Sequence, residues 1–263
     1  MPNIAEDRAA LTGKRLEMFR RDEAHLELAR SIFLDEGWQA LTFLNLSKRT
    51  GFARSRFYER FGSKEGLIAE IALRGQRELL TAVYYASRFP GRSRERLFAV
   101  ADGIVRYFQR HTDNERIFGF ANSRPVLEKL PPETQAEMAH SELAALEIAE
   151  GIVRDAVREG DLVLPDSSLC RTIAFGLWTV QAGLFSGLRI PPFVERSGAA
   201  TLIADFYTNA QHLADSYGWK PLSTEHDWNA TSQRIAKYFN EATPLESPTG
   251  TDEPSGELSR QIL

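Results

Sequence analysis

A short basic and aromatic segment, residues 45–64, holds the side chains best suited to binding a polyanion. Its basic residues are Lys48, Arg49, Arg54, Arg56, Arg60 and Lys64. Glu59 is its one acidic residue, so the segment carries +5, whereas the whole chain carries −4 and the remainder therefore −9. Because the positive charge is confined to one segment, it indicates one local surface for nucleic acid rather than a protein that is basic throughout.

The residues before this charge cluster predict a short helix that ends in a sharp turn. Thr42 is a favourable N-cap, and Phe43 and Leu46 fall on one side of a helix that runs to about Thr50. Gly51 follows, and glycine adopts the left-handed conformation without a Cβ penalty. We therefore expect the chain to change direction at Gly51.

A second helix is predicted from about Ala53, and it carries most of the basic residues. Phe57 and Phe61 are four residues apart and share its buried face, while Phe52 can fill the angle between the two helices. Ser63 can cap a longer third helix. Exposed arginines on a helix are often only solvated. The helix, glycine turn and basic helix together, however, indicate a helix-turn-helix that reads DNA.

The segment from residue 24 to residue 79 resembles the N-terminal domain of TetR-type transcriptional regulators. The matching positions of its first helix are Leu26, Ala29, Ile32, Phe33 and Gly37. The matching positions of the next helices are Thr42, Leu46, Gly51, Phe57, Tyr58, Phe61, Ser63, Lys64 and Leu67. The resemblance implies an all-α protein: an N-terminal three-helix helix-turn-helix domain, then a C-terminal helical domain for effector binding and dimerisation.

Four positions depart from the family pattern. Ala53 stands where a Ser or Thr cap is common, which costs about 1 kcal/mol of local helix stability and removes a possible phosphate contact. Ser47 and Thr50 replace small apolar residues, and Phe52 is larger than the usual Val. The motif tolerates these changes, but they leave the tilt of the second helix open.

Helix-turn-helix geometry and the resemblance assign different roles to the candidate DNA-binding residues. The start of the second helix points into the major groove, so Arg54, Ser55 and Arg56 are the candidates for base edges, with Arg54 foremost. The resemblance assigns backbone contacts to Thr42, Tyr58 and Lys64, with Arg60 as a further candidate. A capping threonine, a half-buried tyrosine and solvated cations are the plain structural alternatives.

Composition limits what else the chain can be. With 263 residues, 43% of them hydrophobic, it can bury a large core in about two domains. It has neither a run of eighteen apolar residues nor a signal segment, so we expect a cytoplasmic protein. Cys170 is its one cysteine, which excludes an intrachain disulfide and a thiolate metal cluster.

An enzyme is not expected, because the five histidines are scattered and no metal, catalytic-triad or phosphate-loop spacing occurs. No catalytic residue, metal or cofactor is predicted. The alternative to a DNA-binding regulator is a helical interaction or structural protein without sequence-specific DNA binding.

Helical periodicity continues beyond the basic segment, with a loop expected around Pro125 and a break at Pro191 and Pro192. The predicted domains are a flexible basic arm (1–21), the helix-turn-helix domain (22–80), a ligand-binding and dimerisation domain (81–218), an extra helix (219–240) and a disordered tail (241–263). The arm can either enter a minor groove or form a frayed extension of the first helix.

Aromatic and polar side chains in the second domain are candidates for an effector pocket. They are Tyr107, Phe108, His111, Phe118, Asn122, Phe175, Trp178 and Gln181. Aromatic residues at helical spacing are also typical of a plain core. The resemblance implies a small apolar or aromatic effector that releases a repressor from its operator.

Three glycines share one face of the helix predicted to end near Leu188. Gly176, Gly183 and Gly187 are seven and four residues apart, and each costs about 1 kcal/mol relative to alanine in a helix. Close approach of another helix is a reason to keep them. The resemblance implies a homodimer interface here and hence a near-palindromic operator, while packing within the chain against the preceding helix is the alternative.

Overall fold

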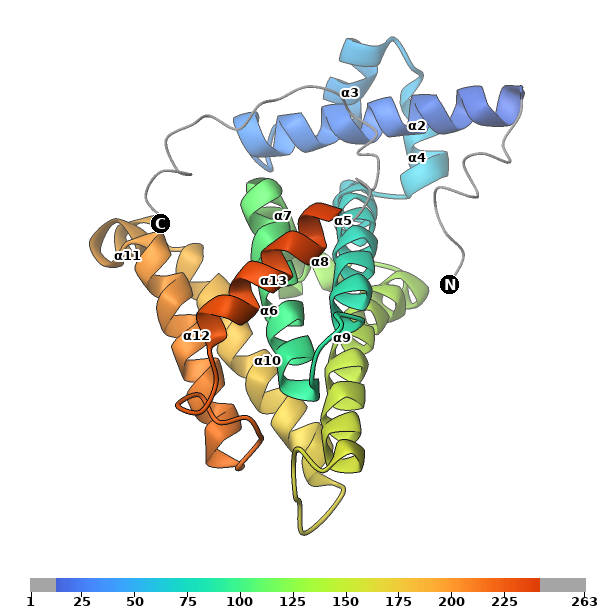
Figure 1. Ribbon diagram of the computed structural model, residues 1–263. Helices are drawn as coiled ribbons and strands as arrows, with labels where there is room; N and C mark the ends of the chain where they lie inside the picture. Colours follow the sequence, from blue (N-terminus) through green and yellow to red (C-terminus); the bar gives the residue numbers. More distant parts are fainter. Residues whose placement is uncertain (1–12, 242–263) are drawn as a thin grey trace. The chain divides into compact units, whose positions relative to one another are not determined.

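The computed structural model describes residues 13–241, in which all regular structure is helical (Figure 1). Residues 1–12, the first part of the predicted arm, and residues 242–263, nearly all of the predicted tail, lie outside this range. The described chain divides into two compact units. One comprises residues up to Arg77 with Asp113–Ser141, and the other comprises Glu78–Thr112 with residues from Glu142 onward.

The first unit is built from short helices around an apolar core. It contains α2 (Lys14–Ser31), the wide helical turn η1 (Ile32–Glu36), α3 (Phe43–Thr50), α4 (Arg54–Phe61), most of α7 (Thr112–Ala121) and α8 (Arg124–Leu127). It also contains the N-terminal parts of α5 (Lys64–Ser87) and α9 (Pro132–Glu159). Its core includes Leu26, Ile32, Leu46, Phe57 and Leu67. Residues 14–21 of the predicted arm are part of α2.

The turn chemistry predicted for the first unit is confirmed. The Thr42 hydroxyl accepts a hydrogen bond of 3.1 Å from the Asn45 backbone N–H, which caps α3. Gly51 ends that helix with a φ of 70°, in the left-handed region. The Ser63 hydroxyl accepts a hydrogen bond of 3.0 Å from the Gly66 N–H at the start of α5. Local sequence therefore determines both ends of α3 and the start of α5.

Two proline segments each begin a short helix. The expected loop around Pro125 is instead the helix α8. The expected break at Pro191 and Pro192 is confirmed, because α10 (Leu169–Leu188) ends before it and α12 (Ala199–Ser216) begins after it, and the prolines themselves begin the short α11 (Pro191–Ser197) between them. Proline suits the first turn of a helix, because its missing N–H has no partner there and its φ already matches the helix.

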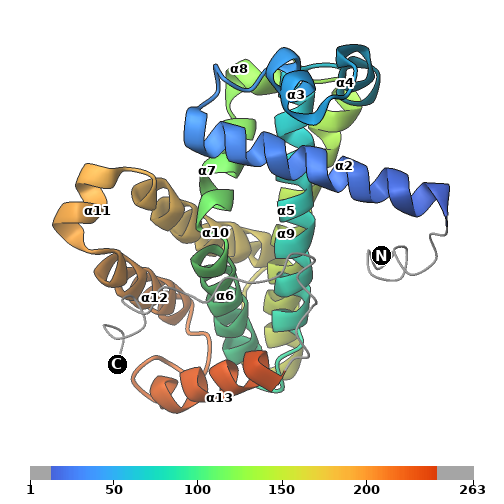
Figure 2. The same ribbon diagram turned by 90° about the horizontal axis from the view of Figure 1, so that it is seen from above.

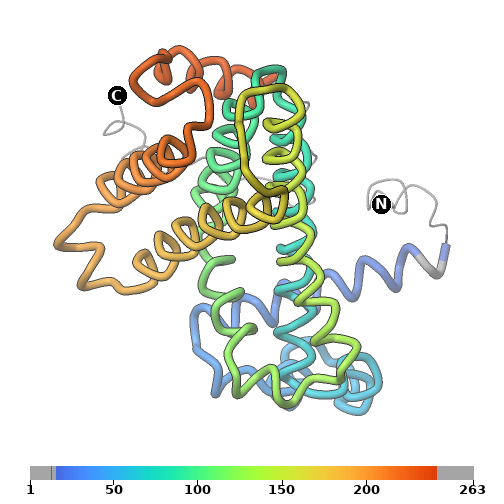
Figure 3. Tube along the Cα trace, turned by 90° about the horizontal axis from the view of Figure 1, so that it is seen from below, coloured from blue at the N-terminus to red at the C-terminus, as the bar shows by residue number. Residues whose placement is uncertain are grey.

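The second unit is a larger helical body. It contains α6 (Ser93–Arg110), α10 (Leu169–Leu188), α11, α12 (Ala199–Ser216) and α13 (Trp228–Glu241), with the C-terminal parts of α5 and α9. Its core includes Val83, Ile104, Ile152, Ile173 and Trp219. The helix α13 lies across α6 (Figure 2), and α10 and α12 run side by side (Figure 3). The extra helix predicted for residues 219–240 corresponds to α13, which begins only at Trp228.

A buried arginine joins three segments of the second unit. Arg94 is 1% exposed, and its guanidinium donates to the carbonyl oxygens of Trp219, at 2.6 Å, and of Pro221, also at 2.6 Å. It also donates to the carbonyl of Gln211, at 2.8 Å, and forms an ion pair of 2.6 Å with Asp215. Arg94 therefore holds the end of α12 and the following loop against the start of α6.

The next residue, Glu95, ties α13 to the same place. Its carboxylate accepts hydrogen bonds from the Thr231 hydroxyl at 3.1 Å and from Arg234 at 2.7 Å. It also accepts from the Arg92 backbone N–H at 2.9 Å, at the start of α6. The extra C-terminal helix is thus fixed by buried polar contacts as well as by apolar packing.

Within residues 13–241, the length and hydropathy of each helix taken alone fall short of what crossing a membrane requires. The pair α10 and α11 meets that requirement only when the two are joined across a bend of 100°.

Candidate nucleic-acid interface

Aromatic packing holds α4 against its neighbours. The rings of Phe43 and Phe57 stack with centroids 5.8 Å apart, which joins α3 to α4. Phe52 lies against His25 of α2 at 4.9 Å and against Phe57 at 6.0 Å. Burial lowers the pKa of His25 below its ordinary value, which favours the neutral ring in this cluster. Phe52 therefore packs between α2 and α4, whereas the sequence predicted it in the angle between α3 and α4.

The first turn of α4 presents its polar side chains to solvent. Arg54, Ser55 and Arg56 are all exposed and adjacent. The Arg54 guanidinium donates a hydrogen bond of 2.8 Å to the hydroxyl of Tyr58, which is itself 47% exposed. Among the described residues, Arg56 forms no ion pair. Two guanidinium groups and a hydroxyl therefore stand on one rigid helical turn, where they can meet an anionic or hydrogen-bonding surface.

The N-terminus of α4 lacks a side-chain cap. Ala53 is its N-cap residue, with extended backbone angles and no side-chain hydrogen bond, as its sequence predicts. The first N–H groups of a helix need partners outside the helix, and they carry partial positive charge. The N-terminus of α4, which has no side-chain cap and is followed by Arg54 and Arg56, can therefore donate backbone N–H groups to an acceptor on a binding partner.

Lys64 occupies the start of the next helix, α5, against an aromatic ring. Its ammonium lies 4.0 Å from the centroid of the Trp38 ring and 3.4 Å from the Trp38 carbonyl oxygen. These contacts restrict the flexible lysine chain to one position. Trp38 was not identified from the sequence, because it lies far from Lys64 along the chain and no local pattern connects them.

Two other basic residues of the segment have acidic partners. Arg60 lies 3.2 Å from an Asp22 carboxylate oxygen and 3.8 Å from one of Glu70, and Arg49 lies 2.7 Å from Glu36. Partly neutralised guanidinium groups attract a polyanion less strongly than unpaired ones. Among the described residues, the basic side chains of this segment that form no ion pair are therefore Lys48, Arg54, Arg56 and Lys64.

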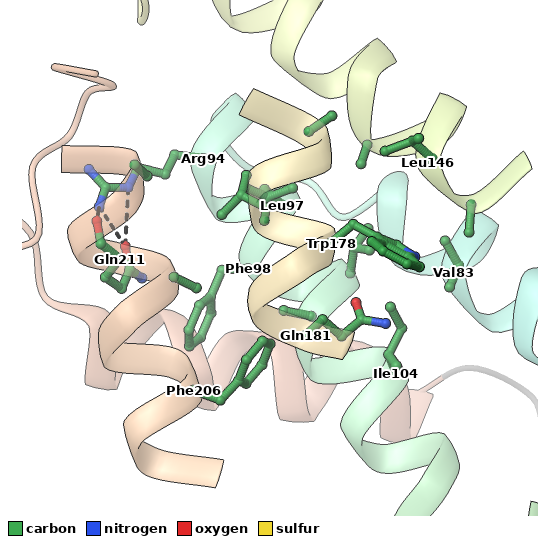
Figure 4. Close-up of a pocket in the computed structure, with 18 of the residues that line it drawn as sticks. Val83, Arg94, Leu97, Phe98, Ile104, Leu146, Trp178, Gln181, Phe206 and Gln211 are labelled. Carbon is green, nitrogen blue, oxygen red and sulfur yellow. Dashed lines mark hydrogen bonds between the residues drawn. The ribbon is translucent and has the colours of Figure 1, made fainter. Parts of the chain in front are cut away.

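The second unit encloses a cavity of about 100 Å³ between α5, α6, α9, α10 and α12 (Figure 4). Its walls are mainly apolar and include Leu97, Phe98, Ile104, Leu146, Leu177 and Phe206. The polar groups in the lining are Arg94, Glu142, Trp178, Gln181 and Gln211. Mostly apolar walls with a few convergent polar groups are typical of a small-molecule site.

Of the eight residues predicted for an effector pocket, Trp178 and Gln181 line this cavity. Phe175 stacks on Trp178 with centroids 5.5 Å apart but is 53% exposed. Phe118 and Asn122 belong to the first unit. Tyr107, Phe108 and His111 form a contact cluster near the end of α6, outside the lining.

Glu142 is a lining residue that was not identified from the sequence. Desolvation raises the pKa of its carboxyl group above the ordinary value, while a hydrogen bond from Trp178 opposes this rise. Glu142 is nevertheless exposed, so it lies at a part of the lining that solvent reaches. Glu142 is on α9 and Trp178 is on α10, and no local sequence pattern predicts that they meet.

Two of the three predicted interface glycines pack against neighbours in their own unit. A Cβ atom added at Gly176 would lie 3.3 Å from Leu213, and one at Gly187 would lie 3.1 Å from Phe193. At Gly183 no atom would lie within 4 Å. Gly176 and Gly187 therefore allow close packing of α12 and α11, respectively, while Gly183 faces outward.

Among residues 13–241, no three His, Cys, Asp or Glu side chains are grouped so that they could hold a metal ion. Cys170 is buried in the apolar core of the second unit.

Comparison with known proteins matches the region that carries this interface. Residues 26–71 match a family model described as bacterial regulatory proteins, tetR family. No curated protein matches the chain in sequence.

Two solved structures have a similar fold. A TetR family transcriptional regulator, PfmR from Thermus thermophilus, is 19% identical with a TM-score of 0.55, over 72% of this chain and 96% of that one. A protein of unknown function from Rhodococcus sp. RHA1 is 18% identical with a TM-score of 0.58, over 75% of this chain and 95% of that one. Residues 26–71 therefore match the domain described for the tetR family of bacterial regulatory proteins, and the chain shares its helical fold with a TetR family transcriptional regulator.

Proposed function

We propose that this protein is a DNA-binding transcriptional regulator: a homodimeric repressor that binds a near-palindromic operator and leaves it when a small molecule enters the cavity of the second unit. The observation that carries the DNA-binding part is the exposed first turn of α4, held by the buried Phe57 and Phe61. Repression and release follow from the family resemblance. Operator DNA lies in the bacterial cytoplasm, which is where we propose that the protein acts.

In the proposed complex, Arg54, Ser55 and Arg56 contact base edges in the major groove. Arginine favours guanine, because its guanidinium can donate to O6 and N7 together. Thr42, Tyr58 and Lys64 contact the DNA backbone, and the Trp38 contact supports a fixed position for the Lys64 ammonium. Arg60 can join them only by exchanging its contacts with Asp22 and Glu70 for a phosphate.

The proposed dimer uses the outward face of α10. Thr172, Phe175, Thr179, Gly183 and Ser186 are exposed at helical spacing, and α10 has no charged residue after Arg171. An exposed helix face that contains Phe and Gly but no charge is favourable for burial against a second copy. Two-fold symmetry would place two α4 helices roughly 34 to 36 Å apart, or a multiple of that distance.

Selection from random DNA duplexes tests the proposal, because it yields the operator sequence and the binding preference in one experiment. The full chain should enrich a sequence with two inverted half-sites, and binding to it should remain specific at physiological salt. A single half-site or no enrichment would contradict the dimeric regulator. The latter result would favour the alternative, a helical interaction or structural protein without sequence-specific DNA binding.

A transcription assay on the selected operator tests the sign of regulation. A promoter overlapping the operator should lose activity when the protein is added, and should regain it when a ligand of the cavity is present. Increased transcription on addition of the protein alone would overturn the repressor assignment and leave DNA binding intact.

A further inference from the structure

The cavity of the second unit contains one acidic side chain without a basic partner. Glu142 and Arg94 are the two charged residues in its lining. Among the described residues, no ion pair joins Glu142 to a lysine or arginine, and its polar neighbour is the indole N–H of Trp178. Glu142 is exposed but partly desolvated, and a hydrogen bond from a neutral indole compensates such a carboxylate only in part.

Arg94 does not supply the missing charge. Its guanidinium is committed to Asp215 at 2.6 Å, to the carbonyl oxygens of Trp219 and Pro221, and to Gln211. With Arg94 paired inside the wall, the charge left facing the cavity is the negative charge of Glu142. Figure 4 shows the Arg94–Gln211 contacts lying on the side of the cavity away from Trp178.

Aromatic rings face the same space. Trp178, Phe98 and Phe206 point into the cavity from α10, α6 and α12 (Figure 4). Aromatic faces attract cations through their quadrupole, and tryptophan does so most strongly. An unpaired carboxylate and aromatic rings in the lining of one mainly apolar cavity thus supply the two elements that recognise a positively charged organic group.

We propose that the cavity binds an organic cation: a molecule of about one ring whose protonated amine lies against Glu142 and whose apolar body contacts Phe98 and Phe206. The inference rests on the proposed function of this cavity as the effector site, and it replaces a general apolar or aromatic effector with a charged one. A volume of about 100 Å³ is of the same order as the roughly 150 Å³ cavity that binds benzene in another protein.

The same geometry disfavours two other ligand classes. A neutral alcohol can donate one hydrogen bond to Glu142 but leaves its charge uncompensated. An anionic ligand would bring a second negative charge into a site whose arginine already has a carboxylate partner. A cation both compensates Glu142 and gains from the aromatic rings, so its affinity should be highest of the three.

Calorimetric titration of the full chain with a matched series tests the charge preference. The probes are 2-phenylethylamine, 2-phenylethanol and 3-phenylpropanoate, which share a phenylethyl body and differ in charge. The amine should bind about tenfold more tightly than the alcohol, and the carboxylate should bind most weakly. Glu142→Gln should remove the preference for the amine and leave affinity for the alcohol nearly unchanged.

Glu147→Gln is the matched control, because Glu147 is an exposed residue of the same helix outside the lining. This variant should keep the full preference. Equal affinity for amine and alcohol, an unchanged preference in Glu142→Gln, or no binding of any probe to the folded protein would overturn the proposal.

DNA release is measured separately on the selected operator, so the two ideas can fail independently. If the amine binds the cavity but the operator stays bound, the cation site stands and its role in release is wrong. If the alcohol or the carboxylate releases the operator and the amine does not, ligand-controlled release stands and the cation assignment is wrong.

Discussion

The Arg54 guanidinium lies over the ring of Tyr58, 5.3 Å from its centroid, and donates a 2.8 Å hydrogen bond to its hydroxyl. Tyr58 in turn packs edge-on against Phe43 of α3, with centroids 4.7 Å apart. Arg54 therefore has a defined position before any partner binds. In the proposed complex this contact couples a residue that reads bases to one that contacts the backbone, so the two roles must be separated by experiment.

Arg54→Ala should relax base preference. Losing a guanidinium that donates to two guanine atoms costs about 1 to 3 kcal/mol on the best operator and less on operators changed at that base. Fluorescence anisotropy with the selected operator and its single-base variants measures the difference. Arg54→Lys is the control for charge: it should retain the salt dependence of binding while losing much of the preference. Equal losses on all sequences would contradict base reading by Arg54.

Lys64→Ala should weaken binding to all sequences alike. A lysine at a phosphate releases counterions, so its removal should lower the slope of log affinity against log salt by about 1. The measurement is a salt titration on the selected operator and on a scrambled duplex. Arg158→Ala, at a 73% exposed position in the second unit, is the matched control and should leave the slope unchanged. A loss restricted to the operator would assign Lys64 to base reading instead.

The elements that sequence predicted well are those fixed by neighbouring residues. Thr42 and Gly51 bound α3 through a side-chain cap and a left-handed turn, both decided by residues within a turn of the helix end. Pro125 shows the limit of such rules, because proline is compatible both with a loop and with the first turn of a helix.

The features that sequence could not predict depend on residues far apart in the chain. Arg94 and Asp215 stand near opposite ends of the second unit's sequence and meet only because α6 and α12 pack together. Glu142 and Trp178 meet in the same way across the cavity. The aromatic and polar residues predicted for an effector pocket therefore included Trp178 and Gln181, which line the cavity. The sequence could not distinguish them from the Tyr107–His111 cluster, which does not.

Arg94→Met should destabilise the second unit strongly. It leaves Asp215 without its cation and several buried carbonyl groups without a donor, and breaking a buried pair in this way costs about 3 to 5 kcal/mol. Urea unfolding measures the change in the free energy of unfolding. Arg158→Met, at an exposed position, should change it by less than about 0.5 kcal/mol. A small effect of Arg94→Met would show that the loop after α12 is held by apolar packing instead.

Glu142→Gln should stabilise the protein at neutral pH and have a smaller effect in acid. Desolvation raises the pKa of Glu142 above its ordinary value of 4.5, so the folded protein holds this proton more tightly than the unfolded chain does. Folding is then penalised as pH rises from about that value through the raised pKa, and the penalty is complete above it. Glutamine keeps the size of the side chain and cannot ionise, so it avoids the penalty.

The measurement is the difference in melting temperature between Glu142→Gln and the unchanged protein across about pH 4 to 8. The difference should be smallest at the acid end, widen as the Glu142 carboxyl loses its proton, and then remain constant. An organic amine in the cavity should narrow it at neutral pH, because the cation stabilises the ionised carboxylate of the unchanged protein alone. Glu147→Gln is the matched control substitution, since Glu147 is exposed and lies outside the lining. A Glu142→Gln variant that melts below the unchanged protein at neutral pH, with the deficit vanishing in acid, would mean that Glu142 is stabilised as a carboxylate in the folded protein, and would remove the electrostatic basis of the proposed cation site.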